Sequence, residues 1–153
     1  MRDEIVLRKA EPADYDTVIR VVDEWWGRPL SVSLPRLFLD HFADTSTIAE
    51  ADGALAGFLI GFLSPSVKST AYIQFIGIHP DHRGGGLARE LYERFFDMAR
   101  ADGRTIVRAI TSPVNTGSIN FHRKMGFTVA GPIQDYNGPE RHMMTFERNI
   151  ERS

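Results

Sequence analysis

A run of three glycines, Gly84-Gly85-Gly86, follows Arg83 and directly precedes a helical pattern that begins at Leu87. Because glycine has no Cβ, the backbone N–H groups of such a loop are open to a ligand. The first N–H groups of the following helix add the positive end of the helix dipole. With the arginine charge beside it, this loop predicts an anion cradle that suits a phosphate. A tight turn that only needs positive φ is the alternative that the glycines leave open.

The two standard nucleotide-binding motifs do not fit this loop. A P-loop needs Lys and Ser or Thr after its last glycine, whereas Leu87-Ala88-Arg89 follows here. A dinucleotide fingerprint needs a further glycine where the sequence has Arg89. Neither an NTPase nor a dinucleotide-binding enzyme is therefore favoured.

Metal and thiol chemistry are also disfavoured. His79, Asp81 and His82 lie close together before the glycines, but no fourth ligand is visible, so we expect no metal. The sequence has no cysteine, which excludes disulfides, thiolate metal sites and a cysteine nucleophile.

Two segments resemble the motifs of the GNAT superfamily of acyl-CoA N-acyltransferases. Arg83-Gly84-Gly85-Gly86-Leu87-Ala88 is similar to the signature Gln/Arg-x-x-Gly-x-Gly/Ala, and it follows a strand ending in Ile76-Gly-Ile-His-Pro80. Asn115-Thr-Gly-Ser-Ile-Asn-Phe-His-Arg-Lys-Met-Gly-Phe127 resembles the segment Asn-x-x-Ser/Ala-x-x-Phe/Leu-Tyr-x-x-x-Gly-Phe. The resemblance extends over about residues 5–148 in element order, and the two motifs together are more specific than either alone.

The resemblance implies acetyl-CoA as the acyl donor. The pyrophosphate would lie on the loop N–H groups, and the pantetheine arm would bond like an added strand between two diverging strands. An N–H near Ile76 would stabilise the oxyanion of the attacked thioester. Asn115 would bond the cofactor arm, cap a helix, or do both. The implied cofactor-binding residues are Ile76, Gly77, Ile78, Arg83, Gly84, Gly85, Gly86, Leu87, Ala88, Asn115 and His122.

Acid–base residues are harder to assign. The family commonly has a tyrosine at the position of His122, where it would protonate the leaving thiolate. Histidine can do this near neutral pH, and packing against the cofactor is the alternative. Many relatives carry a glutamate where this sequence has Tyr72, with Gln74 two residues further on. Gln74 would position a water that takes the proton of the amine, so the predicted catalytic residues are Tyr72, Gln74 and His122.

The acceptor would be a primary amine of a small molecule or a protein. With no thiol to carry an acyl group, direct attack of the amine on the thioester is favoured. Trp26 continues the buried stripe of the first helix, so Trp25 and Arg28 are the better candidates for substrate contact. Tyr136, in the last hairpin, is predicted to close the same pocket.

The elements that must position these residues follow from hydrophobic periodicity and turn signals. The predicted class is α/β, with a mixed, mostly antiparallel sheet and about four helices in the order β-α-α-β-β-β-α-β-α-β-β. Asp52-Gly53 joins two strands in a hairpin. The strands are predicted at residues 4–9, 47–51, 54–62, 71–78, 105–111, 127–133 and 141–148, and the helices at 13–25, 36–42, 87–101 and 116–125.

Composition narrows the remaining classes. The chain has 153 residues, 42% hydrophobic and 25% charged, which predicts one N-acetyltransferase domain over residues 1–153. A net charge of −2 disfavours nucleic acid as a partner. The longest apolar stretch, residues 54–63, is too short for a membrane span, and residues 1–10 do not read as a secretory signal. A cytoplasmic protein without membrane partners is therefore expected.

The sequence thus predicts an acetyl-CoA-dependent N-acetyltransferase. A non-catalytic acyl-CoA-binding module is the alternative, because the usual tyrosine and glutamate are missing. The second alternative is an unrelated phosphate-binding or partner-binding domain, in which the glycine loop has only a structural role. The resemblance also implies that a homodimer can form through the C-terminal strands.

Overall fold

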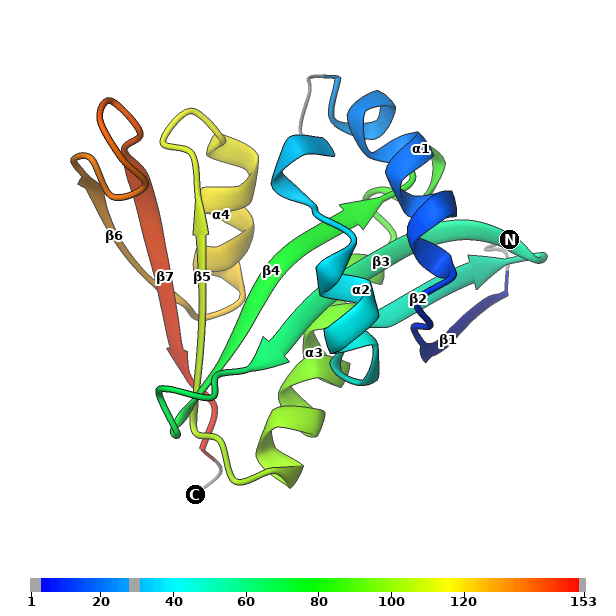
Figure 1. Cartoon of the computed structure of the whole chain (residues 1–153), viewed down its shortest axis with the longest axis horizontal. Helices are drawn as coiled ribbons and strands as arrows, with labels where there is room; N and C mark the ends of the chain where they lie inside the picture. The colour runs from blue at the N-terminus through cyan, green and yellow to red at the C-terminus, as the bar shows by residue number, and fades with distance from the viewer. Residues whose placement is uncertain (1–3, 28–30, 152–153) are drawn as a thin grey trace. The chain divides into compact units, whose positions relative to one another are not determined.

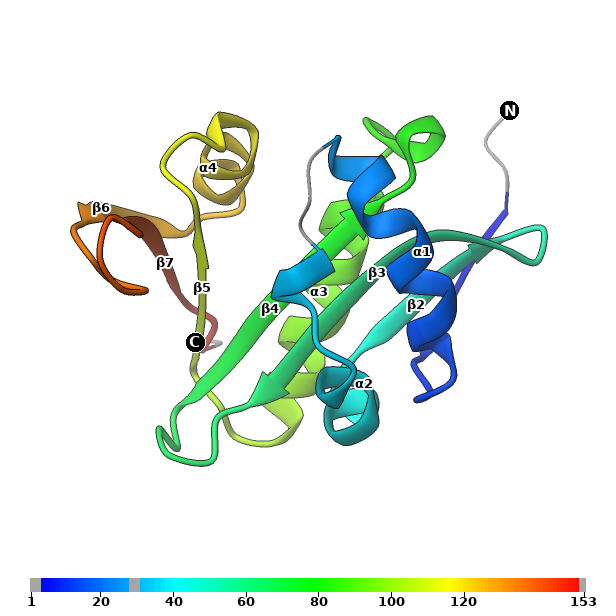
Figure 2. The same cartoon turned by 45° about the horizontal axis from the view of Figure 1, so that its top comes forward.

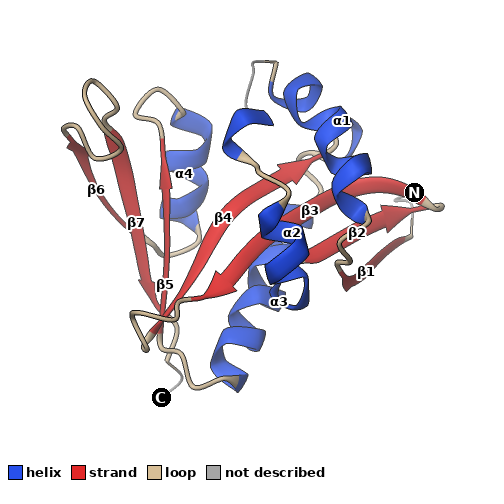
Figure 3. Cartoon of the chain, in the orientation of Figure 1, coloured by secondary structure: helices blue, strands red, loops and turns tan. Residues whose placement is uncertain are grey.

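The computed structural model describes residues 4–27 and 31–151. Its helices and strands follow the predicted order, with boundaries that differ by no more than two residues. The class prediction, α/β with a mixed sheet, is confirmed. The elements, shown in Figure 1 and by type in Figure 3, are β1 (Ile5–Lys9), α1 (Asp14–Trp26), α2 (Leu37–Phe42), β2 (Thr47–Ala51), β3 (Ala54–Leu63), β4 (Thr70–Ile78), α3 (Leu87–Ala101), β5 (Ile106–Thr111), α4 (Thr116–Lys124), β6 (Thr128–Ile133) and β7 (Met143–Asn149).

The strands are hydrogen-bonded in the order β1-β2-β3-β4-β5-β7-β6. The pairs β1/β2, β2/β3, β5/β7 and β6/β7 are antiparallel, whereas β4 and β5 are parallel. The β4/β5 ladder joins three residue pairs, from Thr70↔Ile106 to Tyr72↔Arg108. Strand β4 continues from Ile73 to Ile78 beyond the last of these pairs.

Contacts divide the chain into two compact units. The first unit comprises Met1–Phe62 and Ile73–Met98, and the second comprises Leu63–Tyr72 and Ala99–Ser153. The prediction of one domain over residues 1–153 stays a prediction.

In the first unit, α1 and α2 pack on one face of β2 and β3, and α3 lies on the other face (Figure 2). The Asp52-Gly53 turn has φ values of 51° and 79°, as the hairpin prediction requires. The hydrophobic cluster under α1 and α2 consists of Ala10, Val18, Val22, Trp25, Leu34, Leu39, Ile48, Phe58 and Ile60.

Trp25 corrects one expectation about α1. Its side chain is only 6% exposed and stacks on Phe58, with ring centroids 6.0 Å apart. Trp25 follows Val18 and Val22 at the spacing i, i+4, i+7, which places the three on one helix face. Trp25 therefore belongs to the buried stripe of α1, where only Trp26 is predicted from the sequence, and its contact with a substrate stays a prediction. The side chain of Trp26 and all of Arg28 lie outside the described part of the chain.

In the second unit, α4 packs on β7 through His122, whose ring stacks on Phe146. Arg104 ties the connection between β3 and β4 to this unit, because its Nη1 donates to the carbonyl oxygens of Ser64 and Thr70 at 2.7 and 3.0 Å. Within the described ranges, no helix has the length and apolar character that crossing a bilayer requires.

Candidate functional site

The glycine loop of the first unit has the open backbone that the sequence predicts. Gly84 and Gly86 adopt φ values of 82° and 87°, and an ideal Cβ at either would meet no described atom within 4 Å. Their glycine identity thus serves backbone conformation and not close packing. Gly85 has no such φ, and a Cβ there would lie 3.7 Å from the His82 carbonyl oxygen, an ordinary contact. The carbonyl of Gly86 accepts the N–H of Glu90 at 3.0 Å, which begins α3.

The guanidinium of Arg83 donates hydrogen bonds to backbone carbonyls. Its Nη2 donates to the carbonyl of Trp25 and its Nε to that of Ile78 at 3.3 Å. The Trp25 carbonyl belongs to the last turn of α1, where carbonyls lack helical partners. Arg83 therefore fastens the end of α1 to the end of β4 and to the loop. Its contact with a phosphate stays a prediction.

The histidines before the loop also have structural contacts. Nδ1 of His79 accepts the N–H of Asp81 at 3.0 Å, and the ring meets Trp25 edge-on at 5.3 Å. Among the described residues, no group of three or more His, Cys, Asp or Glu side chains is arranged to hold a metal ion. The prediction of no metal remains untested.

The end of β4 approaches β3 very closely. An ideal Cβ on Gly57 would lie 3.0 Å from the carbonyl oxygen of Gly77 and 3.2 Å from side-chain carbons of Ile78 and Leu87. Sequence reasoning did not single out Gly57, although a glycine inside a strand pattern is the usual signal of such an approach. Gly57 thus keeps β4 and α3 close to β3 at the point where the predicted cofactor-binding backbone, Ile76–Ile78, ends.

In the second unit, the surroundings of Tyr72 keep its phenol uncharged. Burial, with a smaller contribution from nearby Tyr136, raises the pKa of Tyr72 to about 12. The phenol is therefore protonated at neutral pH and can donate a hydrogen bond, but it does not act as a base there. Tyr136, in the last hairpin, thus lies near Tyr72, and its predicted contact with the substrate stays a prediction. Gln74, on β4 in the first unit, is half-buried.

Asn115 caps α4. Its Oδ1 accepts the N–H of Ser118 at 3.2 Å, and its Nδ2 donates to Oγ1 of Thr111 at 3.2 Å. The helix-cap alternative for Asn115 is thus confirmed. Its bond to the cofactor arm stays a prediction.

His122 does not have the surroundings expected of a proton donor. The side chain is 3% exposed, its ring stacks on Phe146 at 3.8 Å, and Nδ1 lies 2.7 Å from the carbonyl oxygen of Ser118. Burial lowers the pKa of His122 to about 4, against a smaller raising effect of the Ser118 bond. The ring is neutral at pH 7 and packs on Phe146, which disfavours the predicted acid; a contact of His122 with the cofactor stays a prediction.

The family model described as "Acetyltransferase (GNAT) family" matches residues 15–127. The chain is 32% identical over 83 residues to the L-2,4-diaminobutyric acid acetyltransferase of Nocardia farcinica, covering 54% of this chain and 43% of that protein. It therefore belongs to the GNAT acetyltransferase family. The chain spans less than half the length of this relative.

Solved structures share the fold. Ard1 from Thermoplasma volcanium superposes with a TM-score of 0.81 at 19% identity, covering 97% of this chain and 99% of that chain. The diaminobutyrate acetyltransferase EctA from Paenibacillus lautus, in complex with its substrate L-2,4-diaminobutyric acid and coenzyme A, gives a TM-score of 0.76 at 21% identity. The coverage is 99% of each chain. These likenesses support the GNAT order of elements.

Proposed function

We propose that this chain is an acetyl-CoA-dependent N-acetyltransferase that moves an acetyl group from the thioester to a primary amine of an amino acid or another small molecule. The observation that carries the proposal is the glycine loop: in a member of this family, the signature segment forms an open, positive-φ turn directly before α3. The amino-acid acceptor is supported by the diaminobutyric acid acetyltransferase of Nocardia farcinica and by the substrate bound to the Paenibacillus lautus enzyme.

In this proposal the pyrophosphate accepts hydrogen bonds from the N–H groups of residues 84–88, at the positive end of α3. The pantetheine arm bonds to the backbone of Ile76–Ile78, and the N–H near Ile76 stabilises the oxyanion. Arg83 holds this loop through the carbonyls of Trp25 and Ile78. Its contribution to binding is then largely one of positioning.

The transfer itself is a direct displacement. The uncharged amine nitrogen forms a bond to the acetyl carbon, the carbon–sulfur bond breaks, and coenzyme A leaves as the thiolate. Tyr72 is protonated at neutral pH, so in this proposal it is a hydrogen-bond donor and not the base. Gln74 cannot titrate, and it is assigned to orienting the amine or a water. The ammonium proton of the acceptor goes to solvent before attack, and the second proton, which the nitrogen loses as the amide forms, passes through solvent to the departing thiolate.

Calorimetry with acetyl-CoA and a thiol-release assay with a panel of amines test this function. We expect saturable acetyl-CoA binding and amine-dependent release of coenzyme A. Gly86→Ala should weaken binding by about tenfold or more, because a Cβ at φ 87° costs roughly 1–2 kcal/mol and shifts the loop. Gly85→Ala is the matched control for strain, since Gly85 is not in the positive-φ region.

The outcomes separate the alternatives. Binding without turnover of any amine would replace the enzyme with a non-catalytic acyl-CoA-binding module. No binding of acetyl-CoA at all would reject both and leave the loop as a structural turn.

A further inference from the structure

In the second unit, α4 packs on one face of the sheet and does not cover the other face. Tyr72 of β4 pairs with Arg108 of β5, and Arg108 pairs with Glu147 of β7. Paired residues of neighbouring strands point to the same face. The helix α4 lies on the opposite face, because His122 stacks on Phe146, the neighbour of Glu147 along β7. Tyr72, Arg108 and Glu147 therefore form a row across the face that α4 leaves open.

Among the described residues, the guanidinium of Arg108 makes a hydrogen bond only through its Nε. Its Nε donates to Oε1 of Glu147 at 2.8 Å, and the two side chains are 43% and 52% exposed. An ion pair this exposed contributes less than about 1 kcal/mol to stability. Within the described residues, the Nη1 and Nη2 groups of Arg108 have no hydrogen-bond partner. They present a planar pair of donors, the geometry that binds a carboxylate through both oxygens.

The neighbouring arginines of this unit differ in this respect. Arg104 has a side chain 12% exposed and donates to the carbonyls of Ser64 and Thr70. Arg148 donates through Nη1 to the carbonyl of Met125, at the end of α4. Both hold backbone together, whereas Arg108 stands beside Tyr72 with its donor pair available.

We propose that Arg108 binds the carboxylate of an α-amino-acid acceptor and thereby selects amino acids over amines that lack this group. This inference rests on the proposed function, whose acceptor it specifies. Glu147 orients the guanidinium from its Nε side, so that Nη1 and Nη2 remain for the substrate. Tyr72, neutral and adjacent, can hydrogen-bond the same carboxylate without repelling it.

The test is a comparison of matched acceptors. L-2,4-diaminobutyrate and 1,3-diaminopropane differ only by the carboxylate, as do L-methionine and 3-(methylthio)propylamine. For each pair, kcat/KM is measured with saturating acetyl-CoA for the unchanged protein and for Arg108→Gln, Arg108→Lys and Glu147→Gln. Arg123→Gln removes an exposed positive charge from α4 and serves as the charge control. Thermal melting of each variant verifies that it is folded.

We expect Arg108→Gln to lower kcat/KM for the amino acids by roughly 10- to 100-fold through KM, because a charge-assisted hydrogen bond is lost. The amines should be nearly unaffected, Arg108→Lys should recover part of the loss, and Glu147→Gln and Arg123→Gln should keep the preference for amino acids. An equal loss for amino acids and amines in Arg108→Gln would overturn the inference, as would the same loss in Glu147→Gln.

Failure of the proposed function gives a different result. If the unchanged protein acetylates none of the four compounds, calorimetric titration with the two amino acids in the presence of coenzyme A decides the inference. Saturable binding that Arg108→Gln abolishes supports the carboxylate site. Absence of binding, or binding that Arg108→Gln leaves intact, rejects it.

Discussion

The imidazole of His122 is held between an aromatic ring and a backbone carbonyl. It lies nearly parallel to Phe146, with an interplanar angle of 7°, and Phe127 meets its ring edge-on at 5.0 Å. The Nδ1–H form donates to the carbonyl of Ser118, so the neutral ring is satisfied where it lies. A positive charge here would be desolvated. This residue therefore makes the second unit sensitive to acid.

We expect the stability contributed by neutral His122 to be complete above pH 6.5, the value of the exposed side chain, and to be lost as the pH falls toward about 4. The loss amounts to about 3 kcal/mol over this range, at about 1.4 kcal/mol per pH unit. His122→Phe keeps the aromatic stacking and cannot be protonated. Urea unfolding at several pH values between 4 and 7.5 should show a flatter dependence in this variant.

Turnover provides a second readout for His122. Because the residue is neutral and buried, His122→Phe should keep amine-dependent release of coenzyme A. A variant that folds but loses turnover would restore the role of general acid to His122.

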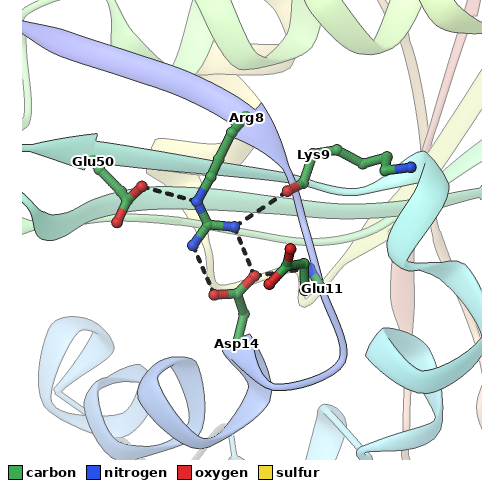
Figure 4. Close-up of polar contacts among 5 residues, drawn as sticks. All are labelled: Arg8, Lys9, Glu11, Asp14 and Glu50. Carbon is green, nitrogen blue, oxygen red and sulfur yellow. Dashed lines mark hydrogen bonds and ion pairs between the residues drawn. The ribbon is translucent and has the colours of Figure 1, made fainter.

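At the scale of elements, Arg8 joins three of them in the first unit (Figure 4). From β1, its Nη1 and Nη2 bind both carboxylate oxygens of Asp14 at 2.9 and 2.8 Å, and its Nε binds Glu50 of β2 at 2.8 Å. Asp14 also accepts the N–H of Glu11 at 2.8 Å and begins α1, whose N-cap position, Ala13, has no capping side chain. The network thus fixes where α1 starts against the sheet, and the Asp14 carboxylate lies at the positive end of the helix dipole.

Asp14→Asn should destabilise the protein by about 1–3 kcal/mol, because the two charge-assisted bonds to Arg8 are weakened in a partly buried site. The Arg8 hydrogen bonds hold the pKa of Asp14 below its ordinary 3.8. The stability from Asp14 is therefore complete above about pH 4 and is lost as the pH falls further through the lowered pKa. Thermal melting at pH 7 and at pH 3 measures both effects.

Asp16 offers a matched control in the same helix. It pairs with Arg36 at 2.5 Å, but both side chains are about half exposed. Asp16→Asn should change the melting temperature little. Equal destabilisation by the two substitutions would show that Asp14 acts through general charge and not through the Arg8 network.

For the whole molecule, the pattern of titratable groups has a consequence for the reaction. Tyr72 is protonated and His122 is neutral and buried, while Gln74 does not titrate. In the proposed enzyme, none of these three residues takes the proton of the acceptor near neutral pH. The fraction of uncharged amine in solution then limits the rate.

We expect kcat/KM to rise about tenfold per pH unit from pH 6 until the pH reaches the pKa of the acceptor amine. Two acceptors with different amine pKa values should give profiles displaced by that difference. Thiol-release assays across the stable pH range measure this. A plateau at the same pH for both acceptors would instead reveal a titrating base on the protein.

Local signals made much of the fold and part of the site predictable. The Asp52-Gly53 hairpin, the positive φ values at Gly84 and Gly86 and the cap at Asn115 depend on nearby residues only. Trp25 was misplaced because Val18 and Ile19 each have a tryptophan seven residues later, Trp25 and Trp26. The spacing alone therefore does not tell which tryptophan is buried. The state of His122 was not predictable, because Phe146, the ring that covers it, comes from a strand distant in sequence. The same holds for the effect of Tyr136 on Tyr72.

The position of Gly85 in the signature loop also provides an experimental handle. The chain contains no cysteine, and Gly85 has ordinary φ and room for a side chain. Gly85→Cys would therefore supply a single thiol, to which an environment-sensitive fluorophore can be attached without competing sites. A spectral change on addition of acetyl-CoA would report occupancy of the loop directly, before any acceptor amine is known.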